Sequence, residues 1–151
     1  MSQLQRLKTL LLILLIALPA VSQADAERPD VMALATLDRF MTAFNDQDIV
    51  SWAATLHYPH VRFASNQVMI YNSATAFQDR SVFPALQATG WDHSLWTNRT
   101  ITLSSDTKVH IDTEFERRDA ANQTIGRYRS LYIVTEQDGH WGIQARSSLA
   151  P

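Results

Sequence analysis

The chain has 151 residues, of which 46% are hydrophobic, with no cysteine and a formal net charge of -2 at pH 7. This length suits one domain with a single core, and without cysteine no disulfide holds it together. The small acidic excess argues against a nucleic acid as partner, because proteins that bind nucleic acids carry a basic surplus.

The first residues have the layout of a secretory signal peptide. Arg6 and Lys8 precede an unbroken apolar run over 10–18, and small residues follow at Ala24 and Ala26. A positive segment, an apolar segment and a small-residue cleavage site in this order are typical of a leader that is removed. The apolar run is also far shorter than the ~20 residues of a membrane-spanning helix.

We therefore expect a signal peptide over residues 1–24, with an alternative cleavage after residue 26, and a domain over 27–151. Cleavage after residue 24 removes two basic residues, which leaves 11 basic and 15 acidic residues and a net charge of -4. The predicted location is periplasmic or secreted, with no membrane association after cleavage.

Helical periodicity marks the start of the domain. Apolar residues at helical spacing predict a helix over 29–44, and Asp48 is a good N-cap for a shorter helix that ends near Leu56. Short strands are expected at 61–64 and 68–71.

A third helical segment follows, and then a long β-rich half. Ser73 is expected to cap the segment and Pro84 to divide it, because proline inside a helix removes a backbone hydrogen bond. The predicted strands lie near 91–104, 108–118, 125–135 and 141–148. Asp138-Gly139 suits the tight turn of the last hairpin. This order predicts an α+β fold in which helices lie on an antiparallel sheet.

Charge pairing across strands suggests a register for these four strands. Glu114 is placed opposite Arg129, since opposite charges across strands are favourable, and the last turn then sets Leu131 opposite Arg146. One face of the sheet would carry Trp96, Val109, Ile111, Phe115, Tyr128, Tyr132, Val134, Trp141 and Ile143. The other would carry His93, Arg99, Ile101, His110, Asp112, Glu114, Glu116, Arg127, Arg129, Leu131, Ile133, Gln144 and Arg146. A one-residue slip at any turn would reverse this assignment.

Two interpretations of these faces are open at this point. In the first, the apolar face packs on the helices and the charged face meets water. In the second, the polar face lines an internal pocket closed by the helices, and the aromatic face packs on a second subunit.

The order of three short motifs resembles the NTF2-like (SnoaL-like) superfamily over essentially the whole domain. They are Phe-Asn-Asp-Gln-Asp at 44–48, Leu-His-Tyr-Pro-His-Val at 56–61 and Asp-Gly-His-Trp-Gly-Ile at 138–143. The ending at 146–151 is similar to the close of the calmodulin-dependent kinase association domain, a family member. The resemblance implies a cone, in which a curved antiparallel sheet wraps around N-terminal helices and encloses a pocket.

The resemblance also implies a site and a dimer. It turns Leu131, Ile133, Gln144, Arg146 and Ser148 toward the pocket, and it assigns the aromatic face to a homodimer interface. This favours the second interpretation of the faces.

Arg146 is the expected principal pocket residue, and Arg129 and Glu114 share its face in the predicted register. Ketosteroid isomerases of the superfamily carry a catalytic carboxylate on the strand after the second helix. Here residues 60–64 hold no acid, so steroid isomerase chemistry is not carried over.

Three function classes follow. We favour an exported protein that binds a small anionic or carbonyl-bearing ligand in an arginine-containing pocket. The second is an isomerase, dehydratase or hydrolase that uses His110, Asp112 or His93 in acid–base catalysis. The third is a dimeric interaction domain with a vestigial pocket. The histidines show no metal-ligand spacing and no glycine-rich phosphate loop occurs, so neither a metal nor a cofactor is expected.

Overall fold

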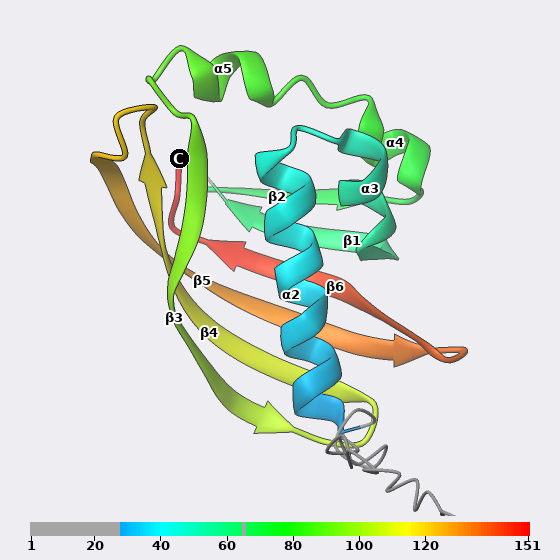
Figure 1. The fold of residues 1–151 in the computed structure, drawn as a ribbon. Coiled ribbons are helices and arrows are strands. Elements are labelled where there is room, and N and C mark those ends of the chain that lie inside the picture. The colour runs from blue at the N-terminus through cyan, green and yellow to red at the C-terminus, as the bar shows by residue number, and fades with distance from the viewer. Residues whose placement is uncertain (1–27, 65) are drawn as a thin grey trace, which may run out of the picture.

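The computed structural model describes residues 28–64 and 66–151 of the chain (Figure 1). The signal peptide predicted over residues 1–24 lies outside these residues. Within the described part, no helix combines the length and the apolar character needed to cross a membrane.

Two helices open the described chain where the sequence predicts them. The long helix α2 spans Pro29–Asn45, and α3 spans Ile49–Ala54. The side chain of Asp48 accepts hydrogen bonds from the backbone N–H groups of Val50 and Ser51. This cap satisfies donors that the first turn of a helix otherwise leaves unpaired.

The third helical segment is divided, as the sequence predicts. It forms α4 over Ala74–Gln78, capped by Ser73, and α5 over Phe83–Gln87, which has its proline in the first turn. The strands are β1 (Leu56–Ala64), β2 (Gln67–Tyr71), β3 (His93–Ser104), β4 (Lys108–Arg118), β5 (Thr124–Gln137) and β6 (His140–Ser148). β1 is longer than the predicted 61–64 and begins directly after α3.

The six strands form one curved, unclosed sheet in the order β2-β1-β6-β5-β4-β3. Figure 1 shows the sheet curving around α2, with the shorter helices at one end. This confirms the predicted α+β class, in which a curved sheet wraps around N-terminal helices. One detail differs from the expectation of an antiparallel sheet, since β1 and β6 pair in parallel.

The aromatic face of the sheet packs on the helices. Tyr132 is 1% exposed, and its ring centroid lies 5.6 Å from that of Phe40 on α2. Val109, Ile111 and Ile143 are fully buried in the same core. The first interpretation of the faces is therefore correct, and the expectation that the aromatic face packs on a second subunit is wrong.

The register is as predicted in part, and several irregularities change it. Glu114 lies opposite Arg129, as the charge pairing predicts. In the last hairpin, an extra residue in β6 at Gln144 shifts the pairing, so Arg146 lies opposite Tyr132. The predicted pairing of Arg146 with Leu131 is wrong for this reason.

Two further irregularities lie in β3, after Trp96 and after Ile101. The first places Arg99 opposite Thr113, whereas the predicted register put Arg99 on the same face as Asp112. Arg99 thereby turns inward, where its guanidinium donates to the backbone carbonyl of Leu34 on α2.

Candidate functional site

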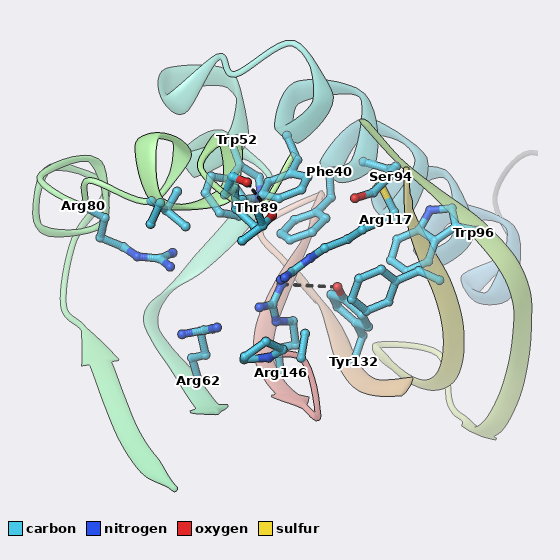
Figure 2. A pocket seen from close by; sticks show the side chains of 18 residues that line it. Phe40, Trp52, Arg62, Arg80, Thr89, Ser94, Trp96, Arg117, Tyr132 and Arg146 are labelled. Atoms are coloured by element: carbon cyan, nitrogen blue, oxygen red, sulfur yellow. Dashed lines mark hydrogen bonds between the residues drawn. The ribbon is translucent and has the colours of Figure 1, made fainter. Parts of the chain in front are cut away.

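A cavity of about 280 Å³ lies between the helices and the inner face of the sheet (Figure 2). Six aromatic side chains form much of its wall: Phe40, Phe44, Trp52, Trp96, Phe115 and Tyr132. The cavity is therefore suited to a small molecule with an apolar part.

Four arginines from separate parts of the fold line the same cavity. Arg62 comes from β1, Arg80 from the segment after α4, Arg117 from β4 and Arg146 from β6. Figure 2 shows these side chains directed toward the space between the helices and the sheet. No Asp or Glu side chain lines the cavity among the described residues.

Aromatic rings, not carboxylates, support three of these guanidinium groups. The Cζ atom of Arg117 lies 4.8 Å from the ring centroid of Tyr128. The Cζ atom of Arg80 lies 4.8, 5.2 and 5.3 Å from the ring centroids of Phe77, Tyr71 and Trp52. Arg146 lies 5.8 Å from the centroid of Phe40. Cation–π contacts hold a guanidinium in place while its N–H donors stay available for another partner.

Several donors on these arginines have no partner in the described structure. The Nε atoms of Arg62, Arg117 and Arg146 are buried without a hydrogen bond. Arg146 Nη1 donates to Tyr132 Oη at 3.4 Å, a long contact. None of the four arginines forms an ion pair with a described Asp or Glu side chain. Since unpaired buried donors are costly, the cavity favours a ligand that accepts hydrogen bonds.

The clustered positive charge is reflected in the pKa values of the arginines. Burial and, to a smaller extent, the nearby Arg146 and Arg80 together lower the pKa of Arg62 to about 10. The pKa of Arg80 and that of Arg117 are lowered too, by burial and by Arg146. An anion in the cavity would relieve this repulsion.

A buried histidine lies beside the cluster. His60 is 3% exposed, and its Nδ1 lies 3.0 Å from the carbonyl oxygen of Ile143. Burial lowers its pKa to about 4, and Arg146, Arg80 and Arg62 contribute to the lowering. His60 is therefore neutral near pH 7 and donates to the carbonyl through Nδ1.

The three candidate acid–base residues lie away from the cavity. His93 pairs with Asp92 at the start of β3. His110 lies opposite Ile133 on the outer face of the sheet, and Asp112, on the same face, forms an ion pair with Arg129. The structure does not bring His93, His110 and Asp112 together around a shared space.

Of the six candidate ligand-binding residues, Arg146 alone lines the cavity. Arg129 and Glu114 lie on the outer face, where Arg129 Nε is 3.9 Å from Glu114 Oε1, so they do not share a face with Arg146 as the predicted register suggested. Leu131 is 37% exposed on that face. Ile133, next to the register shift, also points outward, opposite Ala145. Gln144, at the irregularity itself, donates to the backbone carbonyl of Pro59.

Sequence reasoning missed three of the four cavity arginines. Arg62, Arg80 and Arg117 lie far apart in the chain, and no local motif connects them. The available signal was compositional: after the leader, the chain keeps ten arginines but one lysine, and arginine is the better residue for planar recognition of anions.

A family model described as NTF2-like protein (DUF6841) matches residues 29–150. The match covers nearly all of the described structure. A search of curated proteins finds no match to the chain.

Several solved structures are similar in fold. A protein of unknown function with a cystatin-like fold from Nostoc punctiforme superposes with a TM-score of 0.66 at 13% identity, covering 81% of this chain and 90% of that one. A putative calcium/calmodulin dependent protein kinase II association domain from Xanthomonas campestris gives 0.59 at 20% identity, with 89% and 92% covered. A ketosteroid isomerase-like protein from Erwinia carotovora atroseptica gives 0.59 at 18% identity, with 80% and 95% covered. At these identities the likeness shows the fold alone.

Proposed function

The chain belongs to the NTF2-like protein family (DUF6841), and from that premise we propose that it binds a small anionic molecule in the arginine-lined cavity. The observation that carries this proposal is the convergence of Arg62, Arg80, Arg117 and Arg146 on one space that no Asp or Glu side chain of the described chain lines. Partly buried cations need a counter-charge, and in the described part of the protein none of these four forms an ion pair with an Asp or Glu side chain or with the carboxylate of Pro151, which also lines the cavity.

The wall of the cavity supports a ligand with an apolar body. Aromatic side chains such as Phe40, Trp96 and Phe115 line it beside the arginines. Ligand sites are commonly apolar, with a few placed polar groups that fix orientation. An aromatic or similarly flat anion satisfies both parts of the wall.

The residues that line the cavity favour ligand binding over catalysis as its function. No Asp, Glu or His among the described residues lines the cavity, and His93, His110 and Asp112 lie elsewhere. Carboxylates and histidines are the commonest general bases, and burial raises the pKa of Tyr132, the tyrosine of the cavity wall, which makes it a poor base. We therefore place a pocket enzyme second.

The proposal includes export and self-association as two further parts. Export rests on the basic, apolar and small-residue order of residues 1–26, which is typical of a signal peptide. A homodimer stays a prediction; because the aromatic face is buried against the helices, a dimer would use another surface. Sedimentation at micromolar concentration tests it, and a monomer would contradict it.

A titration of the purified domain with two aromatic anions, benzoate and phenyl phosphate, tests the central proposal. We expect at least one to bind, Arg146→Gln to weaken its binding by about tenfold or more, and Arg129→Gln, on the outer face, to leave the affinity unchanged. If the wild type binds neither anion, or if Arg146→Gln binds as the wild type does, the proposal is wrong.

A further inference from the structure

We propose that the ligand is a phosphate monoester whose dianionic head lies among the four arginines and whose flat apolar body lies against the aromatic wall. This inference rests on the proposed function and specifies the class of anion. Charge, hydrogen-bond donors and shape each contribute to it.

The charge of the cavity exceeds what a single negative charge can compensate. Arg146 lowers the pKa values of Arg62, Arg80 and Arg117, so each of these three guanidinium groups feels the positive charge of Arg146. Coulomb repulsion between like charges is strong where water is excluded. A dianion offsets twice the charge that a carboxylate does.

The donors also exceed what a carboxylate accepts well. Arg62, Arg117 and Arg146 each have a buried Nε without a partner, and they approach from three different strands, β1, β4 and β6. A carboxylate presents two oxygens in one plane. A phosphate monoester presents three terminal oxygens in a tetrahedral arrangement, and arginine binds such oxygens through paired N–H donors.

The aromatic wall requires more than inorganic phosphate. Phe40, Trp96 and Phe115 line the cavity but offer no charge to an anion. A flat apolar group on the ester oxygen would remove this apolar surface from water, which is favourable. The cavity of about 280 Å³ suits a body of about one aromatic ring.

The test compares ligands of matched shape and different charge. Phenyl phosphate is a dianion at about pH 7.5 because its second pKa is near 6. Phenyl sulfate has the same tetrahedral shape with a single charge, benzoate is a planar monoanion, and inorganic phosphate lacks the ring. We expect phenyl phosphate to bind about tenfold more tightly than each of the other three.

The pH dependence of binding gives an independent readout. Between about pH 7.5 and 5 the affinity for phenyl phosphate should fall as the second proton returns to the phosphate, while the affinity for phenyl sulfate should change much less. Arg62→Gln and Arg117→Gln should each reduce the ratio of the affinity for phenyl phosphate to the affinity for phenyl sulfate. Arg127→Gln, on the outer face, should leave this ratio unchanged. Circular dichroism checks that each variant is folded, and the comparison of ligands on the wild type stands without the variants.

The outcomes separate the two proposals. If phenyl sulfate or benzoate binds as tightly as phenyl phosphate and depends on Arg146, the phosphate assignment is wrong and anion binding stands. If inorganic phosphate binds as tightly as phenyl phosphate, the proposal that the ligand has an apolar body is wrong. If none of the four binds, both the inference and the proposed function fail.

Discussion

At the residue scale, burial and the arginines of the cavity together keep His60 in its neutral form. The imidazole is buried beside three arginines and donates to the carbonyl of Ile143. Its pKa of about 4 in the folded protein lies well below the value of about 6.5 for an exposed histidine. Folding therefore requires a neutral ring at this position.

This predicts a loss of stability in acid. Above about pH 6.5 the ring is neutral in both the folded and unfolded states; as the pH falls from 6.5 to 4, the unfolded chain takes up the proton first. The free energy of unfolding should decrease by about 3 kcal/mol from this group, at about 1.4 kcal/mol per pKa unit. Urea denaturation at a series of pH values measures it.

The matched comparison is between two histidines. His60→Asn retains a side-chain N–H donor near the Nδ1 position but cannot be protonated, so its acid loss should be smaller than that of the wild type. His93→Asn, at the start of β3, should lose stability as the wild type does. Identical pH profiles for His60→Asn and the wild type would contradict the assignment.

At the scale of elements, one inserted residue decides which face of β6 carries its arginine. The sequence correctly predicts the Asp138-Gly139 turn, and both residues have positive φ, at 52° and 79°. The pairing Val134↔Ile143 is also as expected, but the irregularity at Gln144 places Arg146 opposite Tyr132. Nothing in the local sequence signals this extra residue. The alternation of apolar and polar residues along a strand does not show where one residue has no partner in the neighbouring strand.

Removal of the extra residue is therefore predicted to turn Arg146 away from the cavity. Deletion of Gln144 should weaken the binding of phenyl phosphate by about tenfold or more. Gln144→Ala keeps the chain length, loses the bond to Pro59 and should retain the affinity. Titration with circular dichroism as a check on folding measures both, and a folded deletion variant with wild-type affinity would show that the irregularity does not position Arg146.

The faces of the sheet illustrate a second limit of the sequence. Alternation along β4 and β5 separates apolar from charged side chains correctly, as the pairing of Glu114 with Arg129 shows. Which face is inside depends on where the helices lie, and alternation does not contain that information. The burial of Tyr132 under α2 supports the simpler expectation that the apolar face meets the helices.

At the scale of the whole molecule, the fold follows from local signals and the site does not. Helix caps such as Asp48 and Ser73 and the last turn are short-range features, and their order predicts the architecture. The cavity depends on four arginines that only the assembled cone brings together. Arg146 was predicted as a pocket residue; Arg62, Arg80 and Arg117 become candidates only when the three-dimensional arrangement is known.

Export is a property of the whole chain, and we predict that the mature protein begins at Asp25 or Glu27. The expected cleavage follows from the small residues that end the leader. N-terminal sequencing of the exported protein measures the start. An intact Met1 on membrane-bound protein would contradict a cleaved signal.

A crystal structure of the domain with phenyl phosphate would show whether the arginine cavity binds an anion. We predict electron density for the phosphate within hydrogen-bond distance of Arg146 and Arg62, with the ring against Phe40 and Trp96. Density for the phosphate only at exposed arginines of the outer face, such as Arg129, with no anion in the cavity, would contradict it.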